Sequence, residues 1–170
     1  MRFEKVSYSA FNKDMVRYGF DPGQIYPAYK NIVVPKRKTK HSAGYDFVTP
    51  VSFVLSPYET MIIPTGIKVY FEPEEAKRWH LALYIRSSIG IKRGIVMANQ
   101  TGVIDSDYYN NIDNEGDMLI AIKNTNNCHV GFRAGDRLIQ GIFQMHGITS
   151  DDEASGERIG GVGSTNKQSV

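Results

Sequence analysis

Hydrophobic residues in this chain gather in short runs that are separated by Pro, Gly, Asn or Ser, and no helical period extends through them. Short runs bounded by turn-forming residues are typical of strands, and their regular recurrence indicates a sandwich or a barrel. The pattern therefore predicts an all-β fold. The predicted strands cover residues 52–55, 60–63, 67–71, 80–85, 95–97, 119–122 and 138–143, with a weaker first strand over residues 2–8.

Two stretches depart from this pattern. Residues 12–29 carry Tyr, Gly, Pro and isolated charges without a period, so we expect a loop with at most one helical turn. Residues 72–79 favour one short helix, because Pro73 suits a first turn and the following glutamates complement the positive end of the helix dipole. The expected fold is thus all-β with one short helix.

Length and composition favour one globular domain followed by a polar arm. With 170 residues, of which 41% are apolar, the chain is long enough for one core and too short for two. From Gly147 onward the residues are small and polar, which leaves little apolar surface to bury. We therefore predict a core over residues 1–146 and a flexible arm over residues 147–170, whose arginine and glycines are suited to close over a phosphate.

Charge and cysteine content exclude several classes of function. Twenty Lys and Arg residues stand against 18 Asp and Glu residues, and a net charge of +2 gives no basic field for non-specific binding of nucleic acid. The single cysteine, Cys128, rules out an internal disulfide. Neither the apolar segment of a signal peptide nor a membrane-spanning run is present. The sequence predicts a cytoplasmic protein that binds neither nucleic acid nor membrane.

The candidate chemistry is concentrated in residues 99–108. Asp105 follows an apolar run there, so its carboxylate would be partly desolvated and held in a fixed direction, as a general base requires. A turn carboxylate would look the same, and this is the preferred interpretation of Asp107.

Other polar positions could bind an anionic ligand or only lie on a solvated surface. Arg86, followed by Ser87 and Ser88, offers the forked donors and hydroxyls that bind phosphate, although a polar strand end has the same composition. Asp46 is a candidate outer ligand of Mg²⁺, since hard oxygen anions suit that ion, but its motif alone is weak. Gln140 lies on the polar face of a predicted strand, where solvated side chains are common.

Two other ligand classes are disfavoured. The glycines of residues 160–163 are neither preceded by a strand nor followed by a helix, as a dinucleotide-binding motif requires. The four histidines are widely separated, and with one cysteine they give no zinc-binding spacing.

The order of these modest motifs is more specific than any one of them. Together they resemble the five ordered motifs of the trimeric dUTPase family, over about residues 31–165. The motifs are residues 43–46 (Ala-Gly-Tyr-Asp), 86–88 (Arg-Ser-Ser), 102–108 (Gly-Val-Ile-Asp-Ser-Asp-Tyr), 135–140 (Gly-Asp-Arg-Leu-Ile-Gln), and Arg158 with residues 160–165 (Gly-Gly-Val-Gly-Ser-Thr).

The resemblance implies a fold and an activity. It implies a distorted jelly-roll-like β-barrel, and a homotrimer in which each active site is assembled from three chains. It also implies hydrolysis of dUTP to dUMP and pyrophosphate with Mg²⁺, which limits uracil incorporation into DNA and supplies dUMP for dTMP synthesis. An arm that reaches a neighbouring site would account for the polar composition after residue 146.

The resemblance also implies a role for each motif residue. Asp105 would activate the water that attacks the α-phosphate, and Tyr108 would pack on deoxyribose and exclude a 2′-hydroxyl. Asn99 and the backbone as far as Gly102 would recognise uracil. The remaining assignments are Ser87 to the α,β-bridging oxygen; Arg86, Ser88 and Gln140 to the phosphates; Asp46 to Mg²⁺ through water; Arg158, Ser164 and Thr165 to the γ-phosphate; and Arg137 to a structural role.

Three features depart from the family pattern. Val162 stands where the family has a Phe that stacks on uracil, in a segment one residue shorter than usual. Ile85 replaces a Pro before the second motif, and Ser88 replaces a common Gly. A longer loop, residues 109–117, follows the third motif. This loop and residues 12–29 are private features that could cover the site or dock a regulatory protein.

Two alternative functions are weighed against dUTP hydrolysis. A dCTP deaminase shares the fold and the Arg-Ser-Ser motif, but Ala121 occupies the place of the glutamate that shuttles protons in deamination. A non-catalytic regulator would not require the retained Asp46, Ser87, Asp105 and Tyr108. A plain β-sandwich binding module would explain none of the ordered motifs.

Overall fold

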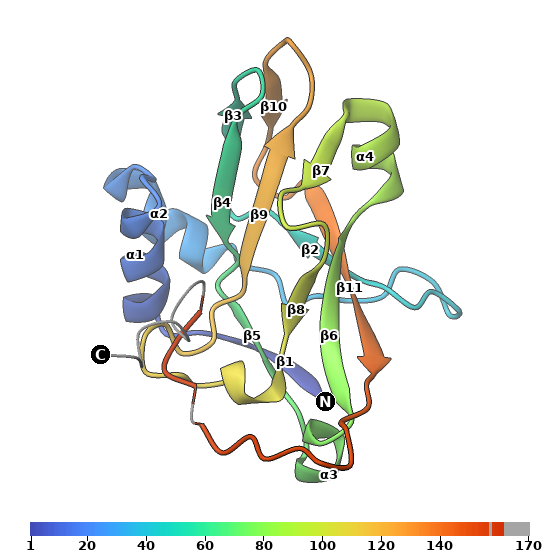
Figure 1. Ribbon diagram of the computed structural model, residues 1–170. Coiled ribbons are helices and arrows are strands. Elements are labelled where there is room, and N and C mark those ends of the chain that lie inside the picture. The colour runs from blue at the N-terminus through green and yellow to red at the C-terminus, as the bar shows by residue number, and fades with distance from the viewer. Residues whose placement is uncertain (157, 162–170) are drawn as a thin grey trace.

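The structure, a computed structural model, describes residues 1–156 and 158–161 (Figure 1). Strands form most of its regular structure, and short helices lie at the edges. The strands are β1 (Arg2–Lys5), β2 (Tyr45–Val48), β3 (Phe53–Leu55), β4 (Thr60–Pro64), β5 (Ile67–Tyr70), β6 (Trp79–Ile85), β7 (Ile95–Met97), β8 (Gly102–Ile104), β9 (Leu119–Asn124), β10 (Val130–Phe132) and β11 (Arg137–Met145). The helices are α1 (Tyr8–Arg17), α2 (Pro22–Lys30), α3 (Pro73–Ala76) and α4 (Ser87–Arg93), with a 3-10 turn over Ser106–Tyr108.

The strands pair in antiparallel fashion and form two main sheets. The larger sheet has the order β2-β11-β6-β8 and the smaller one β4-β9-β7, while β1 pairs with β5 and β3 with β10. Alternate residues of these strands, such as Leu81 and Leu83 of β6 and Ile120 and Ile122 of β9, are fully buried in the shared core. The predicted all-β class is confirmed, and β9 and β11 extend beyond their predicted ends.

The prediction of a single short helix was wrong. Residues 12–29 were expected to form a loop, yet most of them lie in α1 and α2, which stack beside β4 and β5 (Figure 1). The Ser7 hydroxyl caps α1 by accepting a hydrogen bond from the Ala10 amide at 3.2 Å. Asp21 caps α2 in the same way, with Pro22 in the first turn. Gly19, at φ +80°, separates the two helices.

Packing explains why these helices form without a clear sequence period. Phe11 and Met15 of α1 and Ile25 of α2 are fully buried against the core. Helix α1 packs on the turn between β4 and β5, where a Cβ on Gly66 would lie 3.1 Å from the Phe11 ring. Pro27 and the scattered charges make the local sequence a poor helix former, and burial in the tertiary structure outweighs this.

The remaining helices are short. The predicted helix over residues 72–79 is limited to α3, because Trp79 already begins β6. The Glu72 amide donates to the Glu75 carboxylate at 3.0 Å, which completes the first turn. The segment after Arg86, for which a polar strand end was one interpretation, forms α4 and stops at Gly94 in the left-handed conformation.

After β11 the chain contains neither helix nor strand in residues 147–156 and 158–161. This segment runs below the sheets and then turns upward beside the 3-10 turn (Figure 1). No helix within the described residues is long and apolar enough to cross a membrane.

Candidate active site

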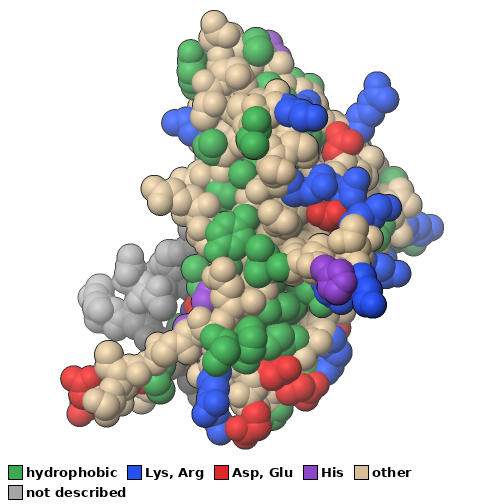
Figure 2. Space-filling view, turned by 90° about the vertical axis from the view of Figure 1, so that its right-hand side faces the viewer, with side chains coloured by type: hydrophobic (Ala, Val, Ile, Leu, Met, Phe, Trp, Pro, Cys, Tyr) green, Lys and Arg blue, Asp and Glu red, His purple; other side chains and the backbone are tan. Residues whose placement is uncertain are grey.

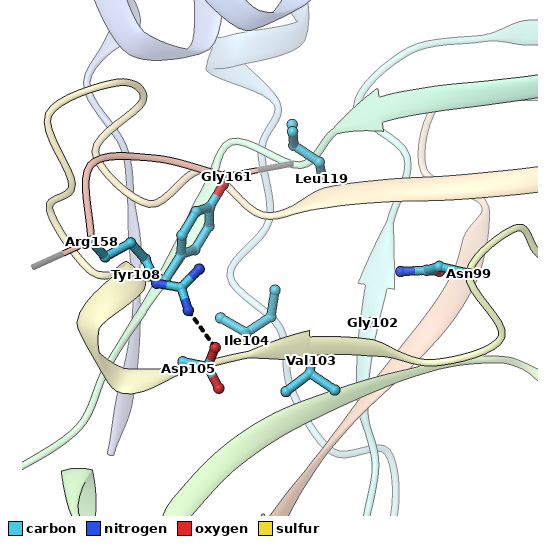
Figure 3. Close-up of a pocket in the computed structure, with 9 residues that line it drawn as sticks. All are labelled: Asn99, Gly102, Val103, Ile104, Asp105, Tyr108, Leu119, Arg158 and Gly161. Atoms are coloured by element: carbon cyan, nitrogen blue, oxygen red, sulfur yellow. Dashed lines mark hydrogen bonds and ion pairs between the residues drawn. The ribbon is translucent and has the colours of Figure 1, made fainter. Parts of the chain in front are cut away.

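A pocket of about 210 Å³ opens where the two sheets separate. β7 pairs with β9 and β8 pairs with β6, so the turn over residues 98–101 carries the chain from one sheet to the other. Gln100 has φ +62°, and the Thr101 amide donates to the Asn99 carbonyl at 2.7 Å, which tightens this turn. The pocket is lined by Asn99, Gly102, Val103, Ile104, Asp105, Tyr108, Leu119, Arg158 and Gly161 (Figure 3).

Asp105 lies directly after β8, between the strand and the 3-10 turn. Ile104, the last residue of β8, is mostly buried and pairs with Leu81, so the sheet fixes the point at which the carboxylate leaves it. Asn99 lies at the far end of the pocket from Tyr108, with Asp105 nearer to Tyr108 (Figure 3). The pocket thus has one polar end formed by a turn and another formed by a carboxylate beside an aromatic ring.

Arg158 of the C-terminal segment covers the Asp105 end of the pocket. Its guanidinium forms ion pairs with the Asp105 carboxylate at 2.5 Å and the Asp107 carboxylate at 2.7 Å. Gly161 lies against the Tyr108 ring, because a Cβ there would be 2.9 Å from the Tyr108 hydroxyl oxygen. The segment therefore folds back on its own chain, and Asp107, which had been set aside as a turn carboxylate, holds it there.

Tyr108 presents its ring to the pocket while its hydroxyl is buried behind it. The hydroxyl donates to the Asp117 carbonyl at 2.9 Å and accepts from Asn114 Nδ2 at 3.0 Å. Burial raises the pKa of Tyr108 above its ordinary value, so the hydroxyl stays protonated and keeps its donor role.

A second pocket, of about 170 Å³, has the composition of a phosphate site. Strand register builds it, because Gln140 of β11 lies opposite Asp46 of β2 on one side and Tyr84 of β6 on the other. Lysine and arginine side chains gather on this side of the molecule (Figure 2). The pocket is lined by Lys38, Thr39, Ser42, Gly44, Asp46, Arg86, Ser87 and Gln140.

Asp46 is the centre of an ion-pair cluster in this second pocket. Its carboxylate contacts Arg86 Nε at 2.9 Å and an Arg137 guanidinium nitrogen at 3.0 Å. The arginine forks are therefore held in place before any ligand binds, and Arg137 has a supporting position. Gly44 is required beside them, since a Cβ there would lie 2.5 Å from the Gln140 amide oxygen.

The two pockets are distant from each other within one chain. Ile104 lies opposite Leu81 of β6, whereas Arg86 follows the other end of that strand. The residues from Leu81 to Arg86, at about 3.3 Å each, span roughly 16 Å along the strand, and Asp105 lies beyond Ile104. Each pocket is also smaller than the roughly 300 Å³ at which ligand sites usually begin.

The structure therefore divides the predicted site residues into two groups. Asn99, Gly102, Asp105, Tyr108 and Arg158 line the first pocket, and Asp46, Arg86, Ser87 and Gln140 line the second. Ser88 lies in α4 and borders neither of these two pockets. Ser164, Thr165 and Val162 lie outside the described residues.

Sequence reasoning missed several residues of both pockets. Leu119 forms a wall of the first pocket, and its position in a strand gave no sign of this. Lys38, Thr39 and Ser42 line the second pocket. The basic composition of residues 36–41 was a usable signal for an anion site, but no motif connected it to Arg86.

Comparison with known proteins identifies the class to which this fold and site belong. The dUTPase family matches residues 30–165 of the chain. A deoxyuridine 5′-triphosphate nucleotidohydrolase of Lactococcus lactis is 42% identical over 146 residues, which cover 84% of this chain and 95% of the relative. A protein of the same name from Haemophilus influenzae is 33% identical, covering 79% of this chain and 88% of the relative.

A solved structure agrees with the sequence comparison. The crystal structure of dUTPase from Streptococcus mutans superimposes with a TM-score of 0.68 and 33% identity, covering 88% of this chain and 99% of that one. The chain belongs to the dUTPase family.

Proposed function

We propose that this chain, a dUTP diphosphatase by its family, hydrolyses dUTP by attack of an Asp105-activated water on the α-phosphorus. The observation that carries the proposal is the position of Asp105, which leaves β8 at the edge of a pocket between a polar turn and an aromatic ring. A carboxylate held by a strand end can accept the water proton while pyrophosphate leaves. The products are dUMP and pyrophosphate.

Recognition of base and sugar is proposed for the first pocket. Asn99 and the backbone as far as Gly102 lie at the end of the pocket away from Tyr108, where they could pair with the imide edge of uracil. A buried polar edge discriminates strongly, because a wrong base would leave its groups unpaired. The Tyr108 ring would pack on deoxyribose, where a 2′-hydroxyl would collide with it.

Triphosphate binding is proposed for the second pocket and the C-terminal segment. Arg86 offers forked donors that match phosphate oxygens, and Ser87 at the start of α4 would contact the α,β-bridging oxygen. Gln140 would add an amide donor. The predicted phosphate contacts also include Ser88, Arg158, Ser164 and Thr165. Arg158 would leave its ion pairs with Asp105 and Asp107 and bind the γ-phosphate instead.

Mg²⁺ is the proposed cofactor, and the residues fit an ion that arrives with the triphosphate. Within the described residues no cluster of three or more His, Cys, Asp or Glu side chains could hold a metal, and Asp46 is already paired with two arginines. Mg²⁺ keeps several waters and takes ligands from one or two carboxylates plus substrate phosphates. Asp46 would hold it through water, and the bound ion neutralises phosphate charge.

A homotrimer with shared sites is proposed from the separation of the two pockets. Ser87 and Asp105 are both assigned to groups next to the same α-phosphorus. Ser87 follows one end of β6 and Asp105 lies beside the other end, so more than about 16 Å separates them along the strand. One chain cannot bring both to one phosphate. A complete site would therefore combine the first pocket of one chain with the second pocket of another. In the cell, the proposed cytoplasmic reaction would limit uracil in DNA and supply dUMP for dTMP synthesis.

Product analysis distinguishes this function from its alternatives. Protein incubated with Mg²⁺ and dUTP should release dUMP and pyrophosphate in equal amounts, and dCTP should be unchanged. Deamination of dCTP would instead indicate the related deaminase. A folded protein that turns over neither nucleotide would leave the non-catalytic regulator as the remaining function.

Asp105→Asn tests the assignment of the base. The amide keeps the size of the side chain but cannot accept the proton, so turnover should fall on the order of 10²-fold or more while dUTP still binds. Wild-type turnover in this variant would remove Asp105 from the role.

A further inference from the structure

The position of the Tyr108 ring is set from behind, by residues that do not touch the pocket. Its hydroxyl donates to the Asp117 carbonyl at 2.9 Å and accepts from Asn114 Nδ2 at 3.0 Å. Both partners belong to the loop over residues 109–117, which is longer here than the family pattern. Whatever fixes this loop therefore fixes the ring that faces the sugar.

Two buried asparagines close the loop on itself. Asn111 Nδ2 donates to the Tyr108 carbonyl and to Asn114 Oδ1, both at 2.9 Å. In return, Asn111 Oδ1 accepts from the Asn114 amide at 3.1 Å. Gly116, at φ +88°, is required for this tight path, because a Cβ there would lie 2.7 Å from the Tyr108 carbonyl oxygen. The loop is compact, and Asp117 ties its end to the turn between β4 and β5, because Asp117 Oδ1 accepts from the Gly66 amide at 2.7 Å. Lys68 of β5 also donates to Asn110 Oδ1 at 2.6 Å.

Helix α1 supplies a further anchor, which acts on Asn114 and Asp113. Asp14 is completely buried, and its Oδ2 accepts from Asn114 Nδ2 at 2.9 Å, the same amide that donates to the Tyr108 hydroxyl. At the surface, Arg17 pairs with the Asp113 carboxylate at 2.7 Å and Lys13 pairs with it at 2.8 Å. The family match begins at residue 30, so α1 lies outside the part of the chain that the family defines.

Stability alone does not account for Asp14. A buried carboxyl group costs free energy, and burial raises the pKa of Asp14. A hydrophobic side chain at this position would avoid that cost. Asp14 also forms an ion pair with Arg17 at 3.3 Å, but Arg17 has a second partner in Asp113. The contact by which Asp14 reaches the site is its bond to Asn114 Nδ2, which orients that amide toward the Tyr108 hydroxyl.

We propose that Asp14 is a positioning residue for sugar selectivity, acting through Asn114 on the Tyr108 ring. The inference rests on the proposed function, in which the ring excludes a 2′-hydroxyl. Steric exclusion of one oxygen atom requires a fixed ring, since displacements of about 1 Å at a reacting site can change rates by up to about 10²-fold. Helix α1 would thus determine how strictly the enzyme rejects ribonucleotides.

Asp14→Leu tests this proposal, because it removes the acceptor and keeps a side chain of comparable size. The ratio of kcat/KM for dUTP to kcat/KM for UTP should fall about tenfold, as expected for loss of one positioning hydrogen bond. Asp14→Asn retains an acceptor oxygen and should stay near the wild-type ratio. Val16→Ala, on the exposed face of the same helix, is the matched control and should leave the ratio unchanged.

The melting temperature of each variant is measured beside the rates. A changed melting temperature with a wild-type ratio in Asp14→Leu would overturn the proposal, since a purely structural role predicts that result. If Asp14→Leu does not fold, the surface double variant Lys13→Ala/Arg17→Ala decides. It loosens the same loop from outside, so a smaller decrease in the ratio supports the proposal and an unchanged ratio overturns it.

Tyr108→Ala separates failure of the inference from failure of the proposed function. If Tyr108→Ala loses selectivity while Asp14→Leu and the double variant keep it, the inference fails and the proposed function stands. A wild-type ratio in Tyr108→Ala removes the sugar role of the ring and the inference with it. Absence of dUTP turnover in the wild-type chain would contradict the proposed function itself.

Discussion

At the scale of single residues, the contact between Arg158 and Asp105 joins the C-terminal segment to the proposed base. An arginine that binds a carboxylate in the free chain can exchange that partner for a phosphate, because both anions accept its forked donors. The exchange would free Asp105 to accept a proton at the moment when substrate is present. The single chain thus holds Arg158 beside the proposed base.

Arg158→Ala should lower kcat/KM for dUTP by about 10- to 100-fold, the usual effect of losing a hydrogen bond to a charged group. Asp107→Asn is the matched control, because it removes the second carboxylate that holds Arg158 in the free chain but not the guanidinium itself. It should change kcat/KM by no more than a few-fold. An equal decrease of kcat/KM in the two variants would show that the contact of Arg158 with its own chain, rather than phosphate binding, sets the rate.

Asp117 should make stability depend on pH. Burial, with the neighbouring Asp14 carboxylate, holds the pKa of Asp117 well above its usual range. A raised pKa means that its contribution to stability is complete below the unfolded-state pKa, about 3.9, and is lost as pH rises through the folded-state pKa. Asp117→Asn should therefore raise the free energy of unfolding at pH 7.5, by about 1–3 kcal/mol, and less at pH 4.5.

Urea unfolding at the two pH values measures this difference, and Asp113→Asn provides a control of opposite sign. Hydrogen bonds from Arg17 and Lys13 lower the pKa of Asp113. The contribution of Asp113 to stability is present above the unfolded-state pKa and is lost as pH falls through the folded-state pKa. Asp113→Asn should therefore lower the free energy of unfolding at pH 7.5. An Asp117→Asn variant less stable than wild type at pH 7.5 would contradict the assignment.

At the scale of elements, the sequence predicted the strands well and the helices poorly. Runs such as residues 80–85 are short, apolar and bounded by turns, so local pattern and tertiary burial agree. In α1 and α2 they disagree. Pro27, a residue that disfavours helix, lies inside α2, and the buried positions of α1 include the charged Asp14. The sequence of these segments therefore shows no clear apolar face.

The candidate site was predictable where chemistry follows from motif order, as for Asp105 and Arg86. It was not predictable where a distant element acts on it. No local signal connects Asp14 to Tyr108, because 100 residues separate Asp14 from Asn114, which joins them. Asp107 lies in a turn, as predicted, but its ion pair with Arg158 had no local signal, since that partner comes from the C-terminal segment.

The C-terminal segment should matter for rate more than for folding. Residues 147–156 and 158–161 pair with no strand, and at the Asp105 end they are held by the ion pairs of Arg158 and by the contact of Gly161 with the Tyr108 ring. The two carboxylates of these ion pairs are about half exposed, which limits what the pairs contribute to stability. Truncation before Gly156 should therefore reduce kcat/KM at least tenfold while the melting temperature changes by only a few degrees, about the effect of 1 kcal/mol in a domain of this size. A large decrease in melting temperature with equal loss of rate would show that the segment is part of the folded core.

At the scale of the whole molecule, the proposed division of the site between two pockets predicts that a second copy of the chain completes each site. The level of Asp105 and that of Arg86 differ by more than about 16 Å along β6, and the strand between them is fully paired in the sheet. No hinge could bring the two together without breaking that sheet. In the proposed symmetric assembly, each interface would join the first pocket of one chain to the second pocket of its neighbour.

Mixing two inactive variants tests this arrangement directly. Asp105→Asn damages only the first pocket and Arg86→Ala only the second, so each variant alone should have little activity. When the two chains are co-expressed in equal amounts with different tags, random assembly of a cyclic oligomer gives intact sites in about a quarter of positions. Turnover of dUTP should therefore recover to about 25% of the wild-type value in the mixed fraction.

The control is the double variant Asp105→Asn/Arg86→Ala, co-expressed with the wild-type chain in the same way. If each site takes its two pockets from different chains, the fraction of intact sites is again about a quarter; if both pockets act within one chain, it is about half. Recovery near zero in the first mixture, with about half in the second, would place the complete site within a single chain. The two mixtures together thus distinguish shared sites from self-contained ones without reference to the stability of either variant.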